Sequence, residues 1–136
     1  MIRIEIDKYK ISRLDEIKEK RLHNYPESWS RFLTDVVLDT TAKPVTMAYV
    51  LSDDVLIGWA YIRYIKANDK SIVYESGSFI EPHHRRNGHA RIALKELVNL
   101  AKRRSNDLNI QIRAQSHTKT ILKELADKSL KVSHLY

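Results

Sequence analysis

The hydrophobic positions near the N-terminus predict one strand followed by two helices. Residues 2–6 alternate isoleucine with polar side chains, and this period of two is typical of a half-buried strand. Ser12, followed three residues later by Asp15, resembles a capping box and predicts that a short helix begins there. Over 24–38, apolar residues recur at the i, i+3, i+4, i+7 spacing of an amphipathic helix. These residues, which we interpret as core packing, are Trp29, Phe32, Leu33, Val36 and Val37.

The pattern then changes to strands. Residues 45–51, 55–66 and 71–81 are strand-like and are joined by short, turn-rich connectors, so we expect an antiparallel meander. The rest of the chain predicts, in order, a helix over 88–104, a strand over 108–114, a helix that begins at Ser116 and a strand over 130–136. This order of elements indicates an α+β fold with one mixed, mostly antiparallel sheet flanked by helices.

Composition narrows the classes of protein that the chain can represent. Its 136 residues suit one domain over 1–136, and a content of 43% hydrophobic and 30% charged residues excludes disordered and membrane-spanning classes. The absence of cysteine excludes disulfides, thiolate catalysis and cysteine zinc sites. The first residues carry charges throughout, unlike a signal peptide, so we expect a cytoplasmic protein of a bacterial cell or, if phage-encoded, of its host.

Charge and glycine usage single out residues 81–97, EPHHRRNGHARIALKEL. The net charge of +7 favours anionic partners, such as nucleic acid, an acidic protein surface or a phosphate-bearing cofactor. The chain has only three glycines, Gly58, Gly77 and Gly88, so we expect each to lie where a side chain is not tolerated. The basic segment is therefore a candidate nucleic-acid patch, metal site or phosphate-binding turn.

A phosphate-binding turn accounts for most features of this segment. A predicted strand ends at Pro82 and a helix begins at Gly88, and the first N–H groups of a helix have no partner within it. They lie at the positive end of the helix dipole, where phosphate is often bound. Gly88 and Ala90 are small enough to let an anion reach the backbone. Arg85 and Arg86 add positive charge beside them.

The two alternatives explain fewer of these residues. The potential metal ligands are Glu81, His83, His84 and His89. Adjacent histidines on an extended loop point apart, and no i, i+4 pair supports them, so we expect no metal. Nucleic-acid binding would favour basic residues along a helix face, whereas here they precede the helix. Nucleic acid is therefore a less favoured partner.

The segment IEPHHRRNGHA is similar to the acetyl-CoA signature of the GNAT superfamily of N-acetyltransferases. That signature has an apolar residue, any residue, Pro, two residues and then Arg/Gln-x-x-Gly-x-Gly/Ala. It is matched in register by Ile80, Pro82, Arg85, Gly88 and Ala90. The stretch VLIGWAYI also resembles the family strand before it. The predicted order of elements resembles the family's from the first strand to near the end, which implies a GNAT-like sheet with a shortened C-terminus.

This resemblance implies a site for acetyl-CoA. The donors to its pyrophosphate would be the main-chain N–H groups of Arg86, Asn87, Gly88, His89 and Ala90, with Arg85 beside them. Phe79 and Ile80 would pair with the pantetheine arm. The N–H of Ser78 would polarise the thioester carbonyl. Residues 115–119 are weaker candidates for cofactor contacts.

The catalytic base and acid are less well marked. Glu75 lies near the family's usual base position but one residue out of register, and a bulge at Gly77 would re-aim its side chain. The alternative is that Glu75 is an exposed strand residue. The usual acid is a tyrosine late in the last helix, just before Gly-Phe, whereas Ala126 or a neighbour stands there in this chain. Potential substitutes are Tyr61, Tyr64, Tyr74 and Tyr136.

Two functions are consistent with these features. The first is an N-acetyltransferase that transfers an acetyl group directly to a protein lysine, an N-terminus or a small amine, as a monomer or homodimer. Tyr25, Glu27 and Arg31 would contribute to its acceptor cleft. The second is a catalytically weak or inactive binding module whose basic face engages an acidic protein or nucleic acid. The missing tyrosine favours the second function, and the intact phosphate-binding turn favours the first.

Overall fold

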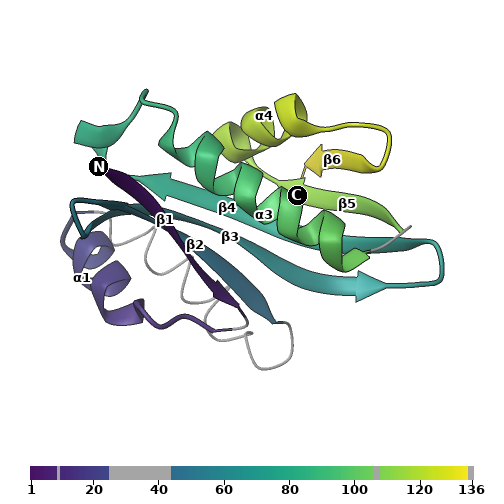
Figure 1. Cartoon of the computed structure of the whole chain (residues 1–136), viewed down its shortest axis with the longest axis horizontal. Helices are drawn as coiled ribbons and strands as arrows, with labels where there is room; N and C mark the ends of the chain where they lie inside the picture. Colours follow the sequence, from purple (N-terminus) through teal and green to yellow (C-terminus); the bar gives the residue numbers. More distant parts are fainter. Residues whose placement is uncertain (9, 25–43, 106–107, 135–136) are drawn as a thin grey trace.

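The computed structural model describes the chain apart from residues 9, 25–43, 106–107 and 135–136, and contains one mixed sheet (Figure 1). Its strands are β1 (Ile2–Lys8), β2 (Val45–Ser52), β3 (Val55–Ala67), β4 (Ser71–Ile80), β5 (Asn109–Ala114) and β6 (Leu130–His134). They lie side by side in chain order, antiparallel up to β4 and parallel from β4 through β5 to β6. The described helices are α1 (Leu14–Asn24), the 3-10 helix η2 (Pro82–His84), α3 (His89–Ser105) and α4 (Ser116–Leu125). The predicted α+β fold is confirmed.

Helices cover both faces of the sheet (Figure 1). On one face, α3 and α4 pack against β2 to β5, and the α3 residues Leu94, Leu97 and Ala101 are fully buried there. On the other face, Ile17 of α1 packs with Tyr49 and other apolar residues of β2 and β3. The strand β2 is accordingly buried at all but its last position. Burial on both faces explains why this strand is apolar almost throughout rather than alternating.

Short turns set the register of the antiparallel strands. Asp53 and Asp54, between β2 and β3, have φ values of 48° and 67°, and a two-residue hairpin turn of type I′ requires positive φ at both positions. Aspartate tolerates this conformation better than most residues. Between β3 and β4, the side chain of Asn68 accepts hydrogen bonds from the N–H groups of Lys70 and Ser71. Both turns therefore contain the residue types that their geometry favours.

The pairing of β4 with β5 ends before β4 does. The parallel register runs from Ser71 opposite Asn109 to Glu75 opposite Arg113. The chain then leaves β5 for α4, whereas β4 continues to Ile80 and stays paired with β3. The last residues of β4 therefore have a strand on one side only, and their other edge is free of strand pairing.

Several local predictions need correction or lie outside the description. α1 begins at Leu14, two residues after the predicted start, and the Ser12 hydroxyl donates to Asp7 at 2.6 Å. The predicted helix over 24–38 lies outside the described residues. The predicted bulge at Gly77 is wrong: the register of β3 and β4 shifts between Tyr64 and Lys66 instead. No helix in the described ranges is long and apolar enough to cross a membrane.

Gly77 has a packing role in place of the predicted bulge. It pairs regularly with Tyr61 of β3, and a Cβ added to Gly77 would lie 2.7 Å from that tyrosine ring. Gly58 is similar, because an added Cβ would lie 2.5 Å from the carbonyl oxygen of Phe79. The prediction that glycine occurs here where a side chain is not tolerated is therefore confirmed for these two positions.

Candidate functional site

A cavity of about 620 Å³ lies where β4 leads into α3. It is bounded by the end of β4, the loop after η2, the first turn of α3 and one face of α4. Its lining residues are Ser78, Phe79, Ile80, His84, Arg85, Arg86, Gly88, His89, Ala90, Arg91, His117, Ile121 and Glu124. Of the predicted cofactor residues, all but Asn87 line this cavity, so the structure brings that set together. The predicted base, Glu75, is absent from the lining.

The loop before α3 exposes backbone donors to the cavity. The carbonyl of Gly88 accepts the bond from the Ile92 N–H at 3.1 Å, so the helical ladder begins at Gly88. The N–H groups of the first turn, from His89 on, then have no partner in the helix. Arg86 and Gly88 both have positive φ, 65° and 77°. This alternation of backbone conformations folds the loop into a concave turn beside the helix start, a geometry that binds anions.

Gly88 differs from the other two glycines. A Cβ added to it would meet no atom within 4 Å, so packing does not require a glycine there. Its positive φ does favour glycine, and the open space beside it belongs to the cavity. His89, next to it, has a buried Nδ1 with no hydrogen-bond partner among the described residues. An open backbone and an unsatisfied polar atom are features that a polar ligand would complete.

Arg85 is held in place by β4. Its Nε donates to the carbonyl of Ile80 at 2.7 Å, and its guanidinium lies 5.6 Å from the centre of the Phe79 ring. These contacts fix a positive charge in the lining of the cavity. They also occupy the Ile80 carbonyl, which lies on the free edge of β4.

The free edge of β4 presents specific backbone groups. The N–H of Glu81 donates to Ile57 of β3 at 2.8 Å, and the direction of strand N–H groups alternates from residue to residue. The N–H groups of Phe79 and Gly77 therefore also point to β3. Those of Ser78 and Ile80 point the opposite way, to the edge that β5 leaves unpaired.

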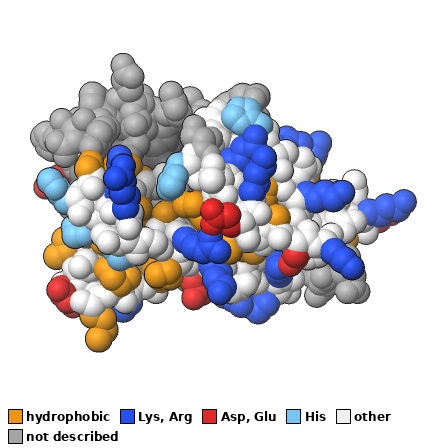
Figure 2. Space-filling view, turned by 90° about the horizontal axis from the view of Figure 1, so that it is seen from above, with side chains coloured by type: hydrophobic (Ala, Val, Ile, Leu, Met, Phe, Trp, Pro, Cys, Tyr) orange, Lys and Arg blue, Asp and Glu red, His pale blue; other side chains and the backbone are white. Residues whose placement is uncertain are grey.

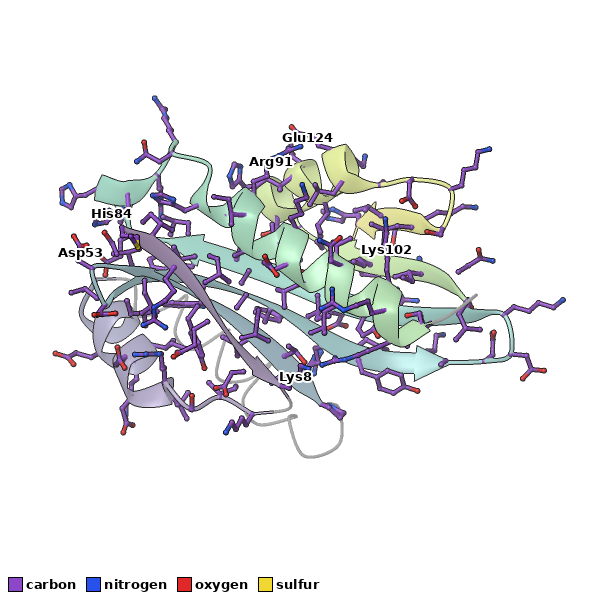
Figure 3. All side chains as sticks on the ribbon, viewed as in Figure 1. Lys8, Asp53, His84, Arg91, Lys102 and Glu124 are labelled. Carbon is purple, nitrogen blue, oxygen red and sulfur yellow. The ribbon has the colours of Figure 1, made fainter. Side chains whose placement is uncertain are left out.

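α4 contributes three residues that the sequence analysis did not name individually as cofactor contacts. His117, Ile121 and Glu124 line the cavity, and their i, i+4, i+7 spacing places them on one helix face. This spacing is the signal that would have found them. Glu124 forms an ion pair with Arg91 of α3, and the two labelled side chains lie together above these helices in Figure 3. The pair links α3 and α4 beside an otherwise basic cavity.

A pair of hydroxyls joins β4 to α4. The Oγ of Ser78 lies 2.7 Å from the Oγ1 of Thr118, and either atom can be the donor. Thr118 is only 6% exposed, whereas Ser78 is half-buried and lines the cavity. The side chain of Ser78 thus faces α4, on the same side of the sheet as α3.

Glu75 lies on the opposite face of the sheet. It is directly across from Arg63 of β3 and forms an ion pair with it. The Arg63 side chain is 8% exposed and that of Glu75 20%. Glu75 is therefore neither the exposed strand residue of the alternative interpretation nor a free carboxylate.

No tyrosine replaces the expected acid among the residues that line the cavity. Ala126 comes after the end of α4 and is exposed, so it does not face the cavity. Tyr74 is buried under the helices, with Tyr64 packed edge-on at 6.4 Å. Tyr61 packs across Gly77 on the α1 face. Tyr136 lies outside the described residues, as do Tyr25, Glu27 and Arg31.

A second polar cluster lies under α1. One oxygen of Asp7 accepts hydrogen bonds from the N–H and the hydroxyl of Ser12 and from the hydroxyl of Tyr49, at 2.7, 2.6 and 3.1 Å. Burial disfavours the Asp7 charge, but these bonds outweigh burial and hold the pKa of Asp7 below its usual value. Burial also raises the pKa of Tyr49 well above its usual range, so its hydroxyl stays protonated and able to donate. This cluster fixes α1 to the sheet.

The charge around the cavity suits an anion. Figure 2 shows more Lys and Arg than Asp and Glu side chains on the face that it presents. The cavity lining itself contains Arg85, Arg86 and Arg91 against a single carboxylate, Glu124. Within the described part of the chain, no three His, Cys, Asp or Glu side chains are grouped to hold a metal ion. The site can therefore bind an elongated polyanion through backbone donors and arginines.

Comparison with known families identifies an acetyltransferase family. The model of the acetyltransferase (GNAT) family matches residues 14–120, which include the whole cavity except Ile121 and Glu124. A search of curated proteins found no match.

Solved structures share the fold at low sequence identity. A predicted acetyltransferase from Clostridium acetobutylicum, solved with acetyl-CoA, is 20% identical over 94% of this chain and 90% of that one, with a TM-score of 0.61. The enzyme AAC(6')-Iy, solved with a bisubstrate analogue, is 19% identical over 90% and 86%, with a TM-score of 0.59. A ribosomal-protein-alanine N-acetyltransferase from Brucella melitensis is 16% identical over 93% and 92%, with a TM-score of 0.60.

Proposed function

Because the chain belongs to the acetyltransferase (GNAT) family, we propose that its cavity binds acetyl-CoA and that the protein transfers the acetyl group to an amine. The observation that carries this proposal is the turn at Gly88, where an open backbone of positive φ adjoins the start of α3. A helix start of this kind binds phosphate, and the pyrophosphate of CoA is the group that fits it. When bound, acetyl-CoA supplies an activated acetyl group as a thioester.

Different residues of the cavity would bind different parts of acetyl-CoA. The N–H groups from Arg86 to Ala90 would hold the pyrophosphate, with Arg85 adding charge in the lining. The free edge of β4, at Ser78 and Ile80, would pair with the amide-containing arm as a neighbouring strand would. The N–H of Ser78 would also donate to the thioester carbonyl, where negative charge develops during transfer.

The acceptor amine would approach from the α1 face of the sheet. That face carries Glu75, which would take a proton from the amine directly or through water, because only a neutral amine attacks a carbonyl. Arg63 holds this carboxylate in place through their ion pair. The identity of the acceptor is open between a small amine and a protein amine, since structures with this fold include an aminoglycoside N-acetyltransferase and a ribosomal-protein-alanine N-acetyltransferase.

Binding of acetyl-CoA tests the proposal without knowledge of the acceptor. We expect acetyl-CoA at about 100 times its Kd to stabilise the protein by about 2.7 kcal/mol, seen as a clear rise in Tm. Calorimetric titration should give a single site. An unchanged Tm together with no measurable heat of binding would refute the proposal and would leave the binding-module alternative.

The role of Glu75 has its own test. Once a screen of amines and proteins with labelled acetyl-CoA has identified an acceptor, Glu75→Gln should reduce kcat more than it weakens acetyl-CoA binding. An unchanged pH–rate profile for this variant would remove Glu75 from the mechanism.

A further inference from the structure

Ser78 lines the cavity, and its hydroxyl partner Thr118 is buried and lies outside the lining. Ser78 lies two residues before the end of β4, deeper along the strand than the other β4 residues of the lining. The proposed phosphate site at Gly88 and Ala90 lies at the other end, beyond η2. The thiol of CoA is at the opposite end of the molecule from its phosphates. The inference rests on the proposed function: with the phosphates of CoA at Gly88 and Ala90, the sulfur lies beside Ser78.

Outside the proposed phosphate site, Ser78 and the exposed His117 are the lining side chains that can donate a hydrogen bond to the sulfur. When an acetyl group leaves CoA, the sulfur keeps the electron pair of the broken C–S bond and becomes a thiolate. No lysine or tyrosine lines the cavity. The arginines of the lining lie in the loop after β4 and the first turn of α3, where the phosphates would be. Ser78 is the lining residue of β4 whose side chain carries a hydroxyl.

Thr118 sets the direction in which the Ser78 hydroxyl can act. The two oxygens are 2.7 Å apart and either can donate. If the buried Thr118 donates to Ser78, the Ser78 proton is free to point into the cavity. Hydrogen bonds in such a chain strengthen one another, and a bond to a charged acceptor is stronger than one to a neutral acceptor.

We propose that the Ser78 hydroxyl, oriented by a hydrogen bond from Thr118, stabilises the thiolate that leaves when CoA gives up its acetyl group. The amine nitrogen forms a bond to the carbonyl carbon as the C–S bond breaks, and the amine proton passes to Glu75 or water. The electron pair of the C–S bond stays on sulfur, which accepts a hydrogen bond from Ser78 without taking its proton. Ser78 is the catalytic residue here, and Thr118 is a positioning residue.

The pKa of the CoA thiol, measured while CoA is bound, reports this bond directly. The chain has no cysteine, so the ultraviolet absorbance of thiolate in the sample comes from CoA alone. With protein in excess over CoA, the absorbance is followed as the pH is raised, against a blank of the same protein. We expect the bound thiol to have a lower pKa than free CoA.

Three variants separate this role from a structural one. Ser78→Ala keeps the backbone N–H and should raise the pKa of the bound thiol by about one unit. Thr118→Val should raise it by less, and Thr118→Ser should restore it. The matched control is Ser76→Ala, on the same face of the same strand, whose hydroxyl donates to Tyr61 at 2.7 Å and does not line the cavity. It should leave the pKa of the thiol unchanged.

The outcomes distinguish this inference from the proposed function. If wild-type protein and Ser78→Ala both bind CoA and the thiol pKa is the same in both, the hydroxyl does not contact the sulfur and the inference is wrong. The proposed function would stand in that case. If Ser76→Ala shifts the pKa as much as Ser78→Ala, the effect is structural and the inference is again wrong. If the wild type does not bind CoA, the proposed function fails and the inference fails with it.

Discussion

The two faces of the sheet are built by different physical means. Under α3 and α4, the core is apolar and the cavity is lined by three arginines, three histidines, apolar and small residues and one carboxylate. On the α1 face, charged and polar side chains bind one another, Arg63 with Glu75 and Asp7 with Ser12 and Tyr49. The first face is arranged to receive a ligand, and the second satisfies its charges within the protein.

This difference predicts what a substitution does on each face. On the α3 side, a change at an exposed lining residue such as Gly88 should alter binding while the fold survives, because such a residue is not part of the apolar core. On the α1 side, removal of one member of a polar pair leaves its partner buried without compensation, which destabilises the protein. Four substitutions, compared with control variants, test this division.

The largest effect is expected for Gly88→Glu. It introduces bulk and negative charge at the helix start, so CoA affinity should fall at least about 100-fold, or about 2.8 kcal/mol. The Tm without ligand should change little, because an added Cβ meets no atom within 4 Å, and positive φ adds only about 1 kcal/mol of strain. Calorimetric titration and thermal melting measure the two quantities.

Gly77→Ala is the matched control for that variant. Its new Cβ would lie 2.7 Å from the Tyr61 ring on the α1 side, so it should lower stability and leave CoA affinity within about twofold. If Gly88→Glu binds CoA normally, the cavity is not the cofactor site.

Arg63→Met should cost stability rather than binding. It removes the guanidinium partner of Glu75, whose side chain is 20% exposed, and leaving this partly buried group unpaired costs about 2 kcal/mol. The double variant Arg63→Met/Glu75→Met should recover most of that loss. Urea unfolding of the single and double variants measures the coupling, and additive losses would show that the pair is not a unit.

Asp7→Asn should lower the free energy of unfolding by about 1–2 kcal/mol at neutral pH, because an amide replaces a charged acceptor of three hydrogen bonds. The pKa of Asp7 is lowered in the folded protein, so its contribution is present above the ordinary pKa and is lost as the pH falls through the folded value. The difference between wild type and variant should therefore shrink below about pH 4. A difference that stays constant down to pH 2 would contradict this assignment.

Glu124→Gln should have the smallest effect, and it should raise CoA affinity rather than lower it. It removes the carboxylate from an anion-binding cavity and frees Arg91, so CoA should bind about two- to fivefold more tightly. The gain should fade at high salt. Asp127→Asn breaks a comparable ion pair with Lys102, neither residue of which lines the cavity, and should leave affinity unchanged. Equal gains in both variants would indicate a general charge effect.

The sequence predicted the site on the α3 side better than the contacts on the α1 side. The reason is that the features of the α3 side lie close together in the sequence. The strand end, the loop and the helix start at 80–90 are contiguous. The pattern that identifies Arg85, Gly88 and Ala90 as a phosphate-binding turn therefore lies within eleven residues. The pairing of Arg63 with Glu75 depends on the register of two strands, which a shift between Tyr64 and Lys66 alters. The bulge at Gly77 was predicted wrongly for the same reason. Gly77 leaves space for the ring of Tyr61, which lies sixteen residues earlier in the chain and opposite it in the sheet.

The α4 contribution was also hard to predict. His117, Ile121 and Glu124 have helical spacing, but apolar and polar residues mix on that face, and nothing nearby in sequence indicates that it meets β4 and α3. The expected tyrosine was sought at Ala126, which proves to lie beyond the end of the helix. The position of a helix end decides which residues face a cavity, and helix ends are the part of an element that sequence defines least well.

The free edge of β4 has a consequence for amide hydrogen exchange. In the absence of ligand, the amides of Gly77 and Phe79 are bonded to β3 while those of Ser78 and Ile80 are not bonded to a strand, so slow and fast exchange should alternate along this segment. A ligand that pairs with the edge acts as the missing strand and turns the alternation into continuous protection. Occupancy of the site would then be visible residue by residue.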